Sequence, residues 1–137
     1  MRYQDWNSRL SDFIEESRNK PFKRGVHDCT FFAAKAISAM RQDIDNLGGE
    51  FKGEYKNKNE AIKLLKKEGF NNLEGLATSK LGEPLHNINY AKTGDCVLIK
   101  YEDQEALGIV IGNNAATAGK EGLYFFDCKH WEKAWGV

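Results

Sequence analysis

The sequence has no excess of charge of either sign, and this argues against a nucleic-acid partner. Lysine and arginine together number 20, aspartate and glutamate also number 20, and the formal net charge is zero. Nucleic-acid-binding domains usually carry a basic excess or a basic stripe. The densest basic cluster, Lys63, Lys66 and Lys67, is interpreted as the solvated face of a helix rather than a phosphate-binding patch.

Long apolar runs are also missing from the sequence. No stretch approaches the roughly 18 apolar residues of a membrane-spanning helix, so we expect no membrane span. Residues 1–6 lack the apolar core of a secretory signal peptide. We therefore expect a protein that is made in the cytoplasm and stays there, or that leaves by a route needing no signal, such as packaging into a virus particle.

The few cysteines exclude further classes of protein. Cys29, Cys96 and Cys128 are an odd number and show no Cys-x-x-Cys pair or zinc-ligand spacing, so neither a disulfide framework nor a metal site is expected. Gly48-Gly49 lacks the Lys-Ser/Thr of a phosphate-binding loop, and no cofactor is expected. Cys96 alternates with apolar residues and Cys128 ends an expected strand, so both are predicted to pack in the core.

Helical periodicity in the first part of the chain and strand patterns in the last part predict the fold class. The 137 residues, 41% of them hydrophobic, suit a single domain spanning residues 1–137. Helices are expected over residues 4–17, 28–40, 58–68 and 73–81, with a loop over 45–49. Strands are expected over residues 94–101, 106–112 and 122–128, with a short strand or turn over 131–137. This order predicts an α+β domain in which N-terminal helices pack on a C-terminal antiparallel meander.

Cys29 is the candidate catalytic residue, because it follows Asp28, a favoured N-cap residue, at the expected start of the second helix. The unpaired N–H groups and the dipole of a helix start stabilise a thiolate, which is the nucleophilic form of cysteine. A nucleophile needs a base, and the candidates are His27, two residues before Cys29, and also His86 and His130. The alternative is that Cys29 is a small buried apolar side chain.

Four segments resemble those of NlpC-type cell-wall peptidases, which have a papain-like fold. Residues 27–34, His-Asp-Cys-Thr-Phe-Phe-Ala-Ala, resemble the Asp-Cys-Ser-Gly-Phe signature that carries the family's nucleophile. Residues 94–98 and 107–112 resemble its Gly-Asp-Leu-Val-Phe and His-Val-Gly-Ile-Tyr-Ile-Gly strands, and residues 131–135 resemble its closing aromatic-basic segment. The order and spacing of the segments agree from Phe22 to the C-terminus.

A compact branch of such domains, carried by tailed bacteriophages and prophages, is more similar still. Residues 25–29, 81–84 and 106–109 match its Gly-x-His-Asp-Cys, Leu-Gly-Glu-Pro and Ala-Leu-Gly-Ile patterns. The resemblance implies a virion tail or tail-assembly setting, other tail proteins as partners, and peptidoglycan as the ancestral substrate. In the family, the cysteine attacks an amide of the stem peptide and a strand histidine is the base.

The sequence departs from the family pattern at the base. The family histidine lies two residues before the strand glycine, and counting back from Gly108 gives Ala106, which cannot accept a proton. The residue that orients the base would come from the next strand, near residues 116–118, where Thr117 is the one polar candidate. General-base help is typically worth about 10²–10⁴-fold in rate, so a thiol without it is a poor catalyst.

These observations favour a bacteriophage tail, tail-tip or assembly protein with an NlpC-like fold that is mainly structural, a pseudoenzyme whose peptidase activity is lost or reduced. The alternative is an active cysteine peptidase or amidase, a hydrolase of peptidoglycan stem peptides with Cys29 as nucleophile and a base from another histidine or a partner chain. A third reading is another role on the same fold, such as an acyltransferase or a toxin-system component.

Overall fold

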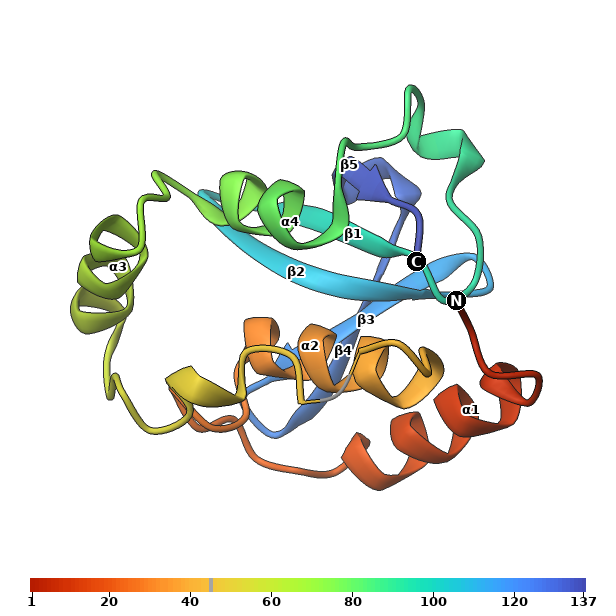
Figure 1. Cartoon of the computed structure of the whole chain (residues 1–137), viewed down its shortest axis with the longest axis horizontal. Helices are drawn as coiled ribbons and strands as arrows, with labels where there is room; N and C mark the ends of the chain where they lie inside the picture. Colours follow the sequence, from red (N-terminus) through yellow and green to blue (C-terminus); the bar gives the residue numbers. More distant parts are fainter. Residues whose placement is uncertain (45) are drawn as a thin grey trace.

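The computed structural model describes residues 1–44 and 46–137 as four α-helices and one five-stranded antiparallel sheet (Figure 1). The helices precede the strands along the chain, which confirms the α+β class. The loop expected over 45–49 includes residue 45, which lies outside the described residues.

The four helices begin and end close to their expected bounds. They are α1 (Trp6–Ser17), α2 (Cys29–Met40), α3 (Lys58–Lys67) and α4 (Leu73–Leu81). The last three begin after Asp28, Asn57 and Asn72, and each of these side chains accepts a hydrogen bond from the main-chain N–H three residues later. Such N-caps satisfy one of the donors that a helix start leaves unpaired, so the sequence itself specifies where these helices begin.

The sheet contains more strands than the sequence pattern predicts. The strands are β1 (Cys96–Tyr101), β2 (Gln104–Ile111), β3 (Asn114–Gly119), β4 (Gly122–Asp127) and β5 (Trp131–Trp135), in the spatial order β4-β3-β2-β1-β5. The residue pattern gave three main strands and missed Asn-Ala-Ala-Thr-Ala-Gly, a run poor in β-branched and aromatic residues. Only the family resemblance placed a strand there, near residues 116–118. Ala116 and Ala118 are buried in the core that contains α2, and their small side chains allow β3 to lie close to that helix.

Both faces of the sheet are covered. Helices α1, α2 and α4 share a core with one face, to which Leu98, Leu107 and Ile109 contribute. The segment around Leu85 and Ile88 covers a smaller cluster on the opposite face. Since α2 contains no fully exposed residue, the expectation that it is the central buried helix is confirmed.

The buried Asp95 joins the two ends of the chain. Its Oδ1 accepts hydrogen bonds from Nη2 of Arg2 at 3.2 Å and from the main-chain N of Val137 at 3.0 Å, and its Oδ2 accepts one from the main-chain N of Lys92 at 2.9 Å. The two termini consequently lie beside each other next to the start of β1 (Figure 1). The Gly-Asp pair before this strand therefore has a structural role.

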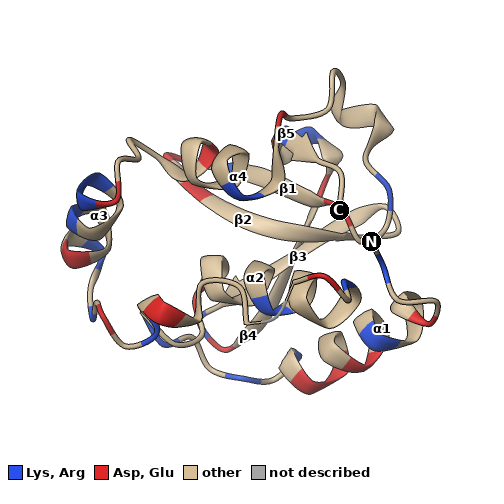
Figure 2. Cartoon of the chain, in the orientation of Figure 1, with Lys and Arg blue, Asp and Glu red and all other residues tan. Residues whose placement is uncertain are grey.

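Charged residues of both signs are interspersed over the helices, as Figure 2 shows. Lys63, Lys66 and Lys67 are exposed on α3, which confirms their interpretation as a solvated helix face. Within the described part of the chain, no helix is both long enough and apolar enough to cross a membrane.

Candidate functional site

The start of α2 carries Cys29 and is held rigidly by Asp28. The Oδ1 atom of Asp28 accepts from the main-chain N of Phe31 at 3.0 Å, which is the predicted N-cap bond. Its Oδ2 atom accepts from the main-chain N of Gly25 at 2.9 Å and from Oη of Tyr55 at 2.6 Å. Three donors on a side chain that is 2% exposed leave little freedom for the turn that presents Cys29.

Gly25 is required by this turn. Its φ angle of 82° lies in the left-handed region, and a Cβ atom at this position would overlap the main-chain carbonyl of Tyr55. The carbonyl of Gly25 also accepts a 2.9 Å hydrogen bond from the main-chain N of Gly53. The connector before α2 is thereby joined to the segment that carries Tyr55, although the two are about 30 residues apart in sequence.

The surroundings of the partly exposed Cys29 raise the pKa of its thiol. Burial raises the pKa of the thiol, and the negative charge of Asp28 raises it further. A backbone hydrogen bond from Leu107, the hydroxyl of Thr30 and the charge of Arg24 act in the opposite direction and lower the pKa, but burial is the largest effect. The Sγ atom lies 3.8 Å from Oγ1 of Thr30. The direction of this pKa shift is opposite to the one that favours a thiolate nucleophile.

Cys29 and Thr117 both form a hydrogen bond with the main chain of Leu107 on strand β2. The backbone of Leu107 hydrogen-bonds Cys29, and the carbonyl of Leu107 accepts a 2.8 Å bond from Oγ1 of Thr117. The paired register of β2 and β3 ends at Ile109 and Ala116, so the main chain of Leu107 is available for these contacts. The Thr117 hydroxyl is therefore held against β2 by a bond to the main chain, and none of the three histidines lines the cleft for it to orient.

Ala106 does not line the space in front of Cys29. Its neighbours on β2, Glu105 and Leu107, do line that space, and side chains alternate between the faces of a strand. Ala106 is therefore directed toward the opposite face of the sheet, and it pairs with Ile99 of β1.

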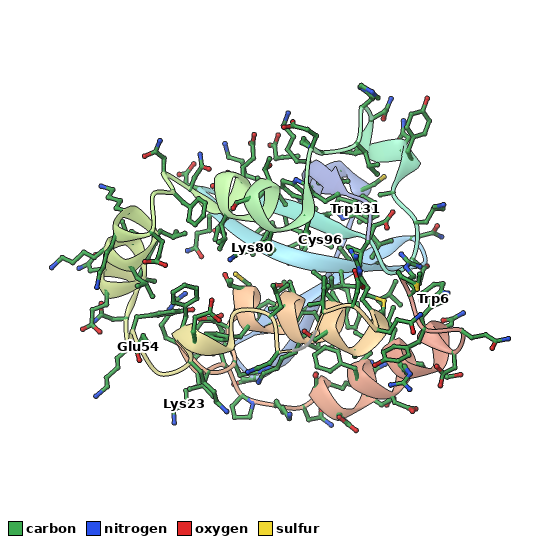
Figure 3. All side chains as sticks on the ribbon, in the orientation of Figure 1. Trp6, Lys23, Glu54, Lys80, Cys96 and Trp131 are labelled. Carbon is green, nitrogen blue, oxygen red and sulfur yellow. The ribbon has the colours of Figure 1, made fainter. Side chains whose placement is uncertain are left out.

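A cleft of about 560 Å³ opens in front of Cys29. Helices α2, α3 and α4 and the β1–β2 hairpin form its walls, and Figure 3 shows the space that they enclose, with Lys80 and Cys96 on its border. The lining is mainly apolar. At the end near α2 the polar groups are those of Arg24, Asp28, Cys29, Thr30 and Tyr55.

All three histidines are described, and none of them lines the cleft. His27 is 7% exposed, and its ring packs edge-on against Phe32 with centroids 6.4 Å apart. Its Nε2 atom is buried without a hydrogen-bond partner among the described residues, and burial lowers the pKa of the ring. His86 is exposed, and His130 packs against Tyr101 at 5.4 Å.

The other two cysteines, Cys96 and Cys128, differ in burial. Cys96 is 1% exposed in the core, as predicted. Cys128 is exposed in a short 3₁₀ helix (Cys128–His130), so the prediction that it packs in the core was wrong. The strand β4 ends at Asp127, one residue earlier than expected, so Cys128 is not part of the strand and its side chain is not directed into the core. Nowhere in residues 1–44 and 46–137 do three or more His, Cys, Asp or Glu side chains gather as metal ligands.

Arg24 and Tyr55 are site residues that the sequence analysis missed. Tyr55 lies in a polar loop segment, and its contact with Asp28 spans 27 residues, so no local pattern indicates it. Arg24 precedes Gly25 in the connector that was interpreted only as a link between helices. Its guanidinium lies 4.7 Å from the ring centre of Phe22 and forms no salt bridge with the described residues.

Comparison with known proteins identifies a family but not an activity. A family model described as "Domain of unknown function (DUF6950)" matches residues 1–137. No curated protein matches the chain.

Proposed function

The chain belongs to the DUF6950 family over residues 1–137, and we propose that it is a bacteriophage tail or tail-assembly protein with an NlpC-like, papain-like fold that no longer cleaves peptide bonds. The fold and the tail setting come from the resemblance of segments 25–29, 81–84, 94–98 and 106–112. The arrangement of a cysteine-led buried helix against an antiparallel sheet is consistent with that resemblance.

The proposed loss of activity rests on the surroundings of Cys29, which raise the pKa of its thiol and supply no base. Burial raises the pKa of its thiol, and no histidine lines the cleft that it faces. The one polar side chain expected on β3, that of Thr117, is bonded to the main chain of Leu107. A cysteine peptidase needs a base within about 2.6–3.2 Å of the nucleophile, or somewhat more in a free enzyme. The described residues offer no imidazole in that position.

A cleavage assay tests this part of the proposal. Purified full-length chain is incubated with peptidoglycan sacculi and with stem peptides, and the products are separated by chromatography and identified by mass spectrometry. We expect the same product level from the natural chain and from Cys29→Ala. Turnover that disappears in Cys29→Ala would refute the loss of activity.

The tail setting has a separate test. A phage or induced prophage that encodes the chain is purified, and its tails are separated from heads and from host proteins. Quantitative mass spectrometry should find the chain enriched with the other tail proteins, which are the expected partners. A chain that stays with soluble host proteins at every stage of assembly would exclude a tail component.

An active peptidase or amidase is the second candidate, and one observation favours it. The cleft reaches Cys29, where the backbone of Leu107 and the charge of Arg24 both lower the pKa of the thiol. A histidine from a partner chain would then have to complete the site. Adding purified tail proteins to the cleavage assay distinguishes the candidates, because only this one expects turnover that depends on both Cys29 and the added partner.

A further inference from the structure

The outer edge of β4 is an unprotected sheet edge. Strand β4 lies at one end of the order β4-β3-β2-β1-β5, and its register with β3 is continuous, without a bulge. Between Leu123 and Phe126 it carries no charged residue and no proline. Tyr124 and Phe125 in this stretch are 49% and 42% exposed. Proteins usually blunt a sheet edge with charges, proline, a bulge or a covering segment, so an edge without these features is a template for pairing with another strand.

The opposite edge of the sheet, formed by β5, is protected. The main-chain N of Leu85 donates a 2.8 Å hydrogen bond to the carbonyl of Ala134, so an earlier segment of the chain covers part of this edge. Glu132 and Lys133 are exposed charged residues, and the pairing of β5 with β1 contains a register shift. Strand β5 therefore has the features that β4 lacks, and β4 is the candidate docking edge.

Phe125 and Asp127 direct their main-chain groups to the open side of β4. The main-chain N of Leu123 donates a 3.0 Å hydrogen bond to the carbonyl of Arg18, so the main chain of Leu123 points away from β3. Main-chain groups of alternate residues point to the same side of a strand, so those of Phe125 and Asp127 also point away from β3. Among the described residues, neither of the two has a main-chain partner on that side. The edge is thus open over residues 124–127 and occupied by Arg18 at Leu123.

We propose that a second copy of this chain pairs antiparallel with β4 about a two-fold axis at Phe126, which extends the sheet across both copies. In this register Phe125 lies opposite Asp127 of the second copy, and the two residues exchange main-chain hydrogen bonds on each side of the axis. The second copy leaves the strand after Asp127, where a 3₁₀ helix begins, and so does not reach Arg18. A register centred on Phe125 would instead place Asp127 of the second copy at Leu123, where Arg18 already lies.

The charges beside β4 complement a second copy of the same strand. The guanidinium of Arg18 lies 5.9 Å from the ring centre of Phe125 and also pairs with Glu15 at 3.0 Å. Phe125 and Asp127 lie on one face of β4, because side chains alternate along a strand. The proposed register therefore brings the carboxylate of Asp127 from the second copy beside Arg18. A guanidinium has five N–H donors, so it can bind this carboxylate as well as that of Glu15. One strand thus supplies both members of each ion pair, which favours a second copy over an unrelated chain.

The aromatic side chains of β4 add apolar contacts across the axis. Phe126 lies opposite Phe126 of the second copy, with Tyr124 as its diagonal neighbour. The exposed Cys128 lies opposite Tyr124 of the second copy. The paired segment is short, so we expect a weak dimer with a dissociation constant of about 10–300 µM.

Sedimentation velocity of the full chain at about 5–1,000 µM tests the dimer. We expect one transition from monomer to dimer without larger species, because the described sheet has one open edge. Phe125→Pro removes a main-chain donor at a position where an edge strand tolerates proline, and it should raise the dissociation constant by about tenfold or more. Phe125→Thr is the matched control, since it loses the same ring but keeps the donor, and it should weaken the dimer less. Circular dichroism checks that both variants remain folded.

A disulfide tests the register without relying on the proline variant. Opposite residues of a non-hydrogen-bonded pair have Cα atoms about 4.5 Å apart, which a disulfide can span. Tyr124→Cys should therefore cross-link to Cys128 of the second copy under mild oxidation, and peptide mapping by mass spectrometry should find the bond between positions 124 and 128. Tyr90→Cys is the control and should give only background cross-linking, because Tyr90 is 65% exposed in a 3₁₀ helix outside the sheet.

Several outcomes would overturn the proposed dimer. They are a monomer mass at every concentration, equal effects of Phe125→Pro and Phe125→Thr, and a Tyr124→Cys cross-link that is absent or that persists when Cys128→Ser is added. A chain that stays monomeric but binds an extended segment of another tail protein along β4 would also overturn it, because the occupant would then be a different chain. These measurements use neither the cleavage assay nor the purified tails, so the dimer and the proposed function are tested separately.

Discussion

Tyr55 donates a 2.6 Å hydrogen bond from its hydroxyl to Oδ2 of Asp28, the residue that caps α2 immediately before Cys29. Both side chains are buried, at 8% and 2% exposure. Burial and this bond to a carboxylate both raise the pKa of Tyr55. The contact therefore fixes the neutral hydroxyl as a donor and holds the loop after α2 against the start of α2.

Tyr55→Phe should destabilise the protein by about 1.5–3 kcal/mol, the usual worth of a hydrogen bond to a charged group. The ring still packs against Phe31, so the loss reports the hydroxyl alone. Urea unfolding followed by circular dichroism measures it. Tyr90→Phe is the control, because Tyr90 is 65% exposed, and it should change the free energy of unfolding by less than about 0.5 kcal/mol. Equal effects in the two variants would mean that the Asp28 contact contributes nothing.

Asp95→Asn should destabilise the fold by about 1.5–3 kcal/mol. The change removes the charge that pairs with Arg2, and an amide group cannot accept on both sides from Lys92 and Val137. Thermal unfolding measures the effect, and hydrogen exchange should show greater opening of both termini. Asp103→Asn, at the exposed turn between β1 and β2, should leave both measurements unchanged. Termini that stay protected in Asp95→Asn would contradict this role.

Cys29 should react with iodoacetamide more slowly than Cys128 at pH 7.5. Burial raises the pKa of Cys29, whereas Cys128 is exposed, and only the thiolate reacts. Peptide mapping by mass spectrometry gives the rate at each cysteine, and the rate at Cys29 should still be increasing above pH 9. Faster reaction at Cys29 than at Cys128 near neutral pH would instead indicate an activated nucleophile.

Stability should decrease as the pH falls below about 6.5, in part because of His27. Burial lowers the pKa of His27 in the folded state, so below 6.5 the unfolded chain binds a proton that the folded chain does not. The free energy of unfolding therefore increases with pH through this range and levels off above it. Urea titrations between pH 5 and pH 7.5 measure the slope.

His27→Leu should show a smaller slope over the same range, because it has no proton to gain. His86→Gln is the control and should keep the full slope, since it retains His27 and changes only an exposed side chain. An unchanged slope in His27→Leu would show that the buried ring does not contribute to the pH dependence.

The local features of the site could be predicted from the sequence, but the burial of the Cys29 thiol could not. Asp28 before an apolar run indicates the start of α2 and the place of Cys29, because an N-cap acts within three residues. The alanine at position 106, where the family has histidine, is likewise visible in the sequence, but only the structure shows that this position faces away from the cleft. The effect of burial on the pKa of the Cys29 thiol is not visible there, because it comes from elements packed around α2. The opposing hydrogen bond from the backbone of Leu107 likewise comes from far along the chain.

The sequence by itself determined the α+β order, the bounds of α2, α3 and α4, and the composition that disfavours nucleic acid and a membrane span. These properties follow from local capping, periodicity and charge, which act over a few residues. Only the tertiary structure decided the bounds and pairing of the Ala-rich β3, the place of Tyr55 and Arg24 in the site, and the open, mainly apolar cleft beside α3. Those outcomes depend on which distant surfaces meet, and burial is a property of the packed chain rather than of any segment.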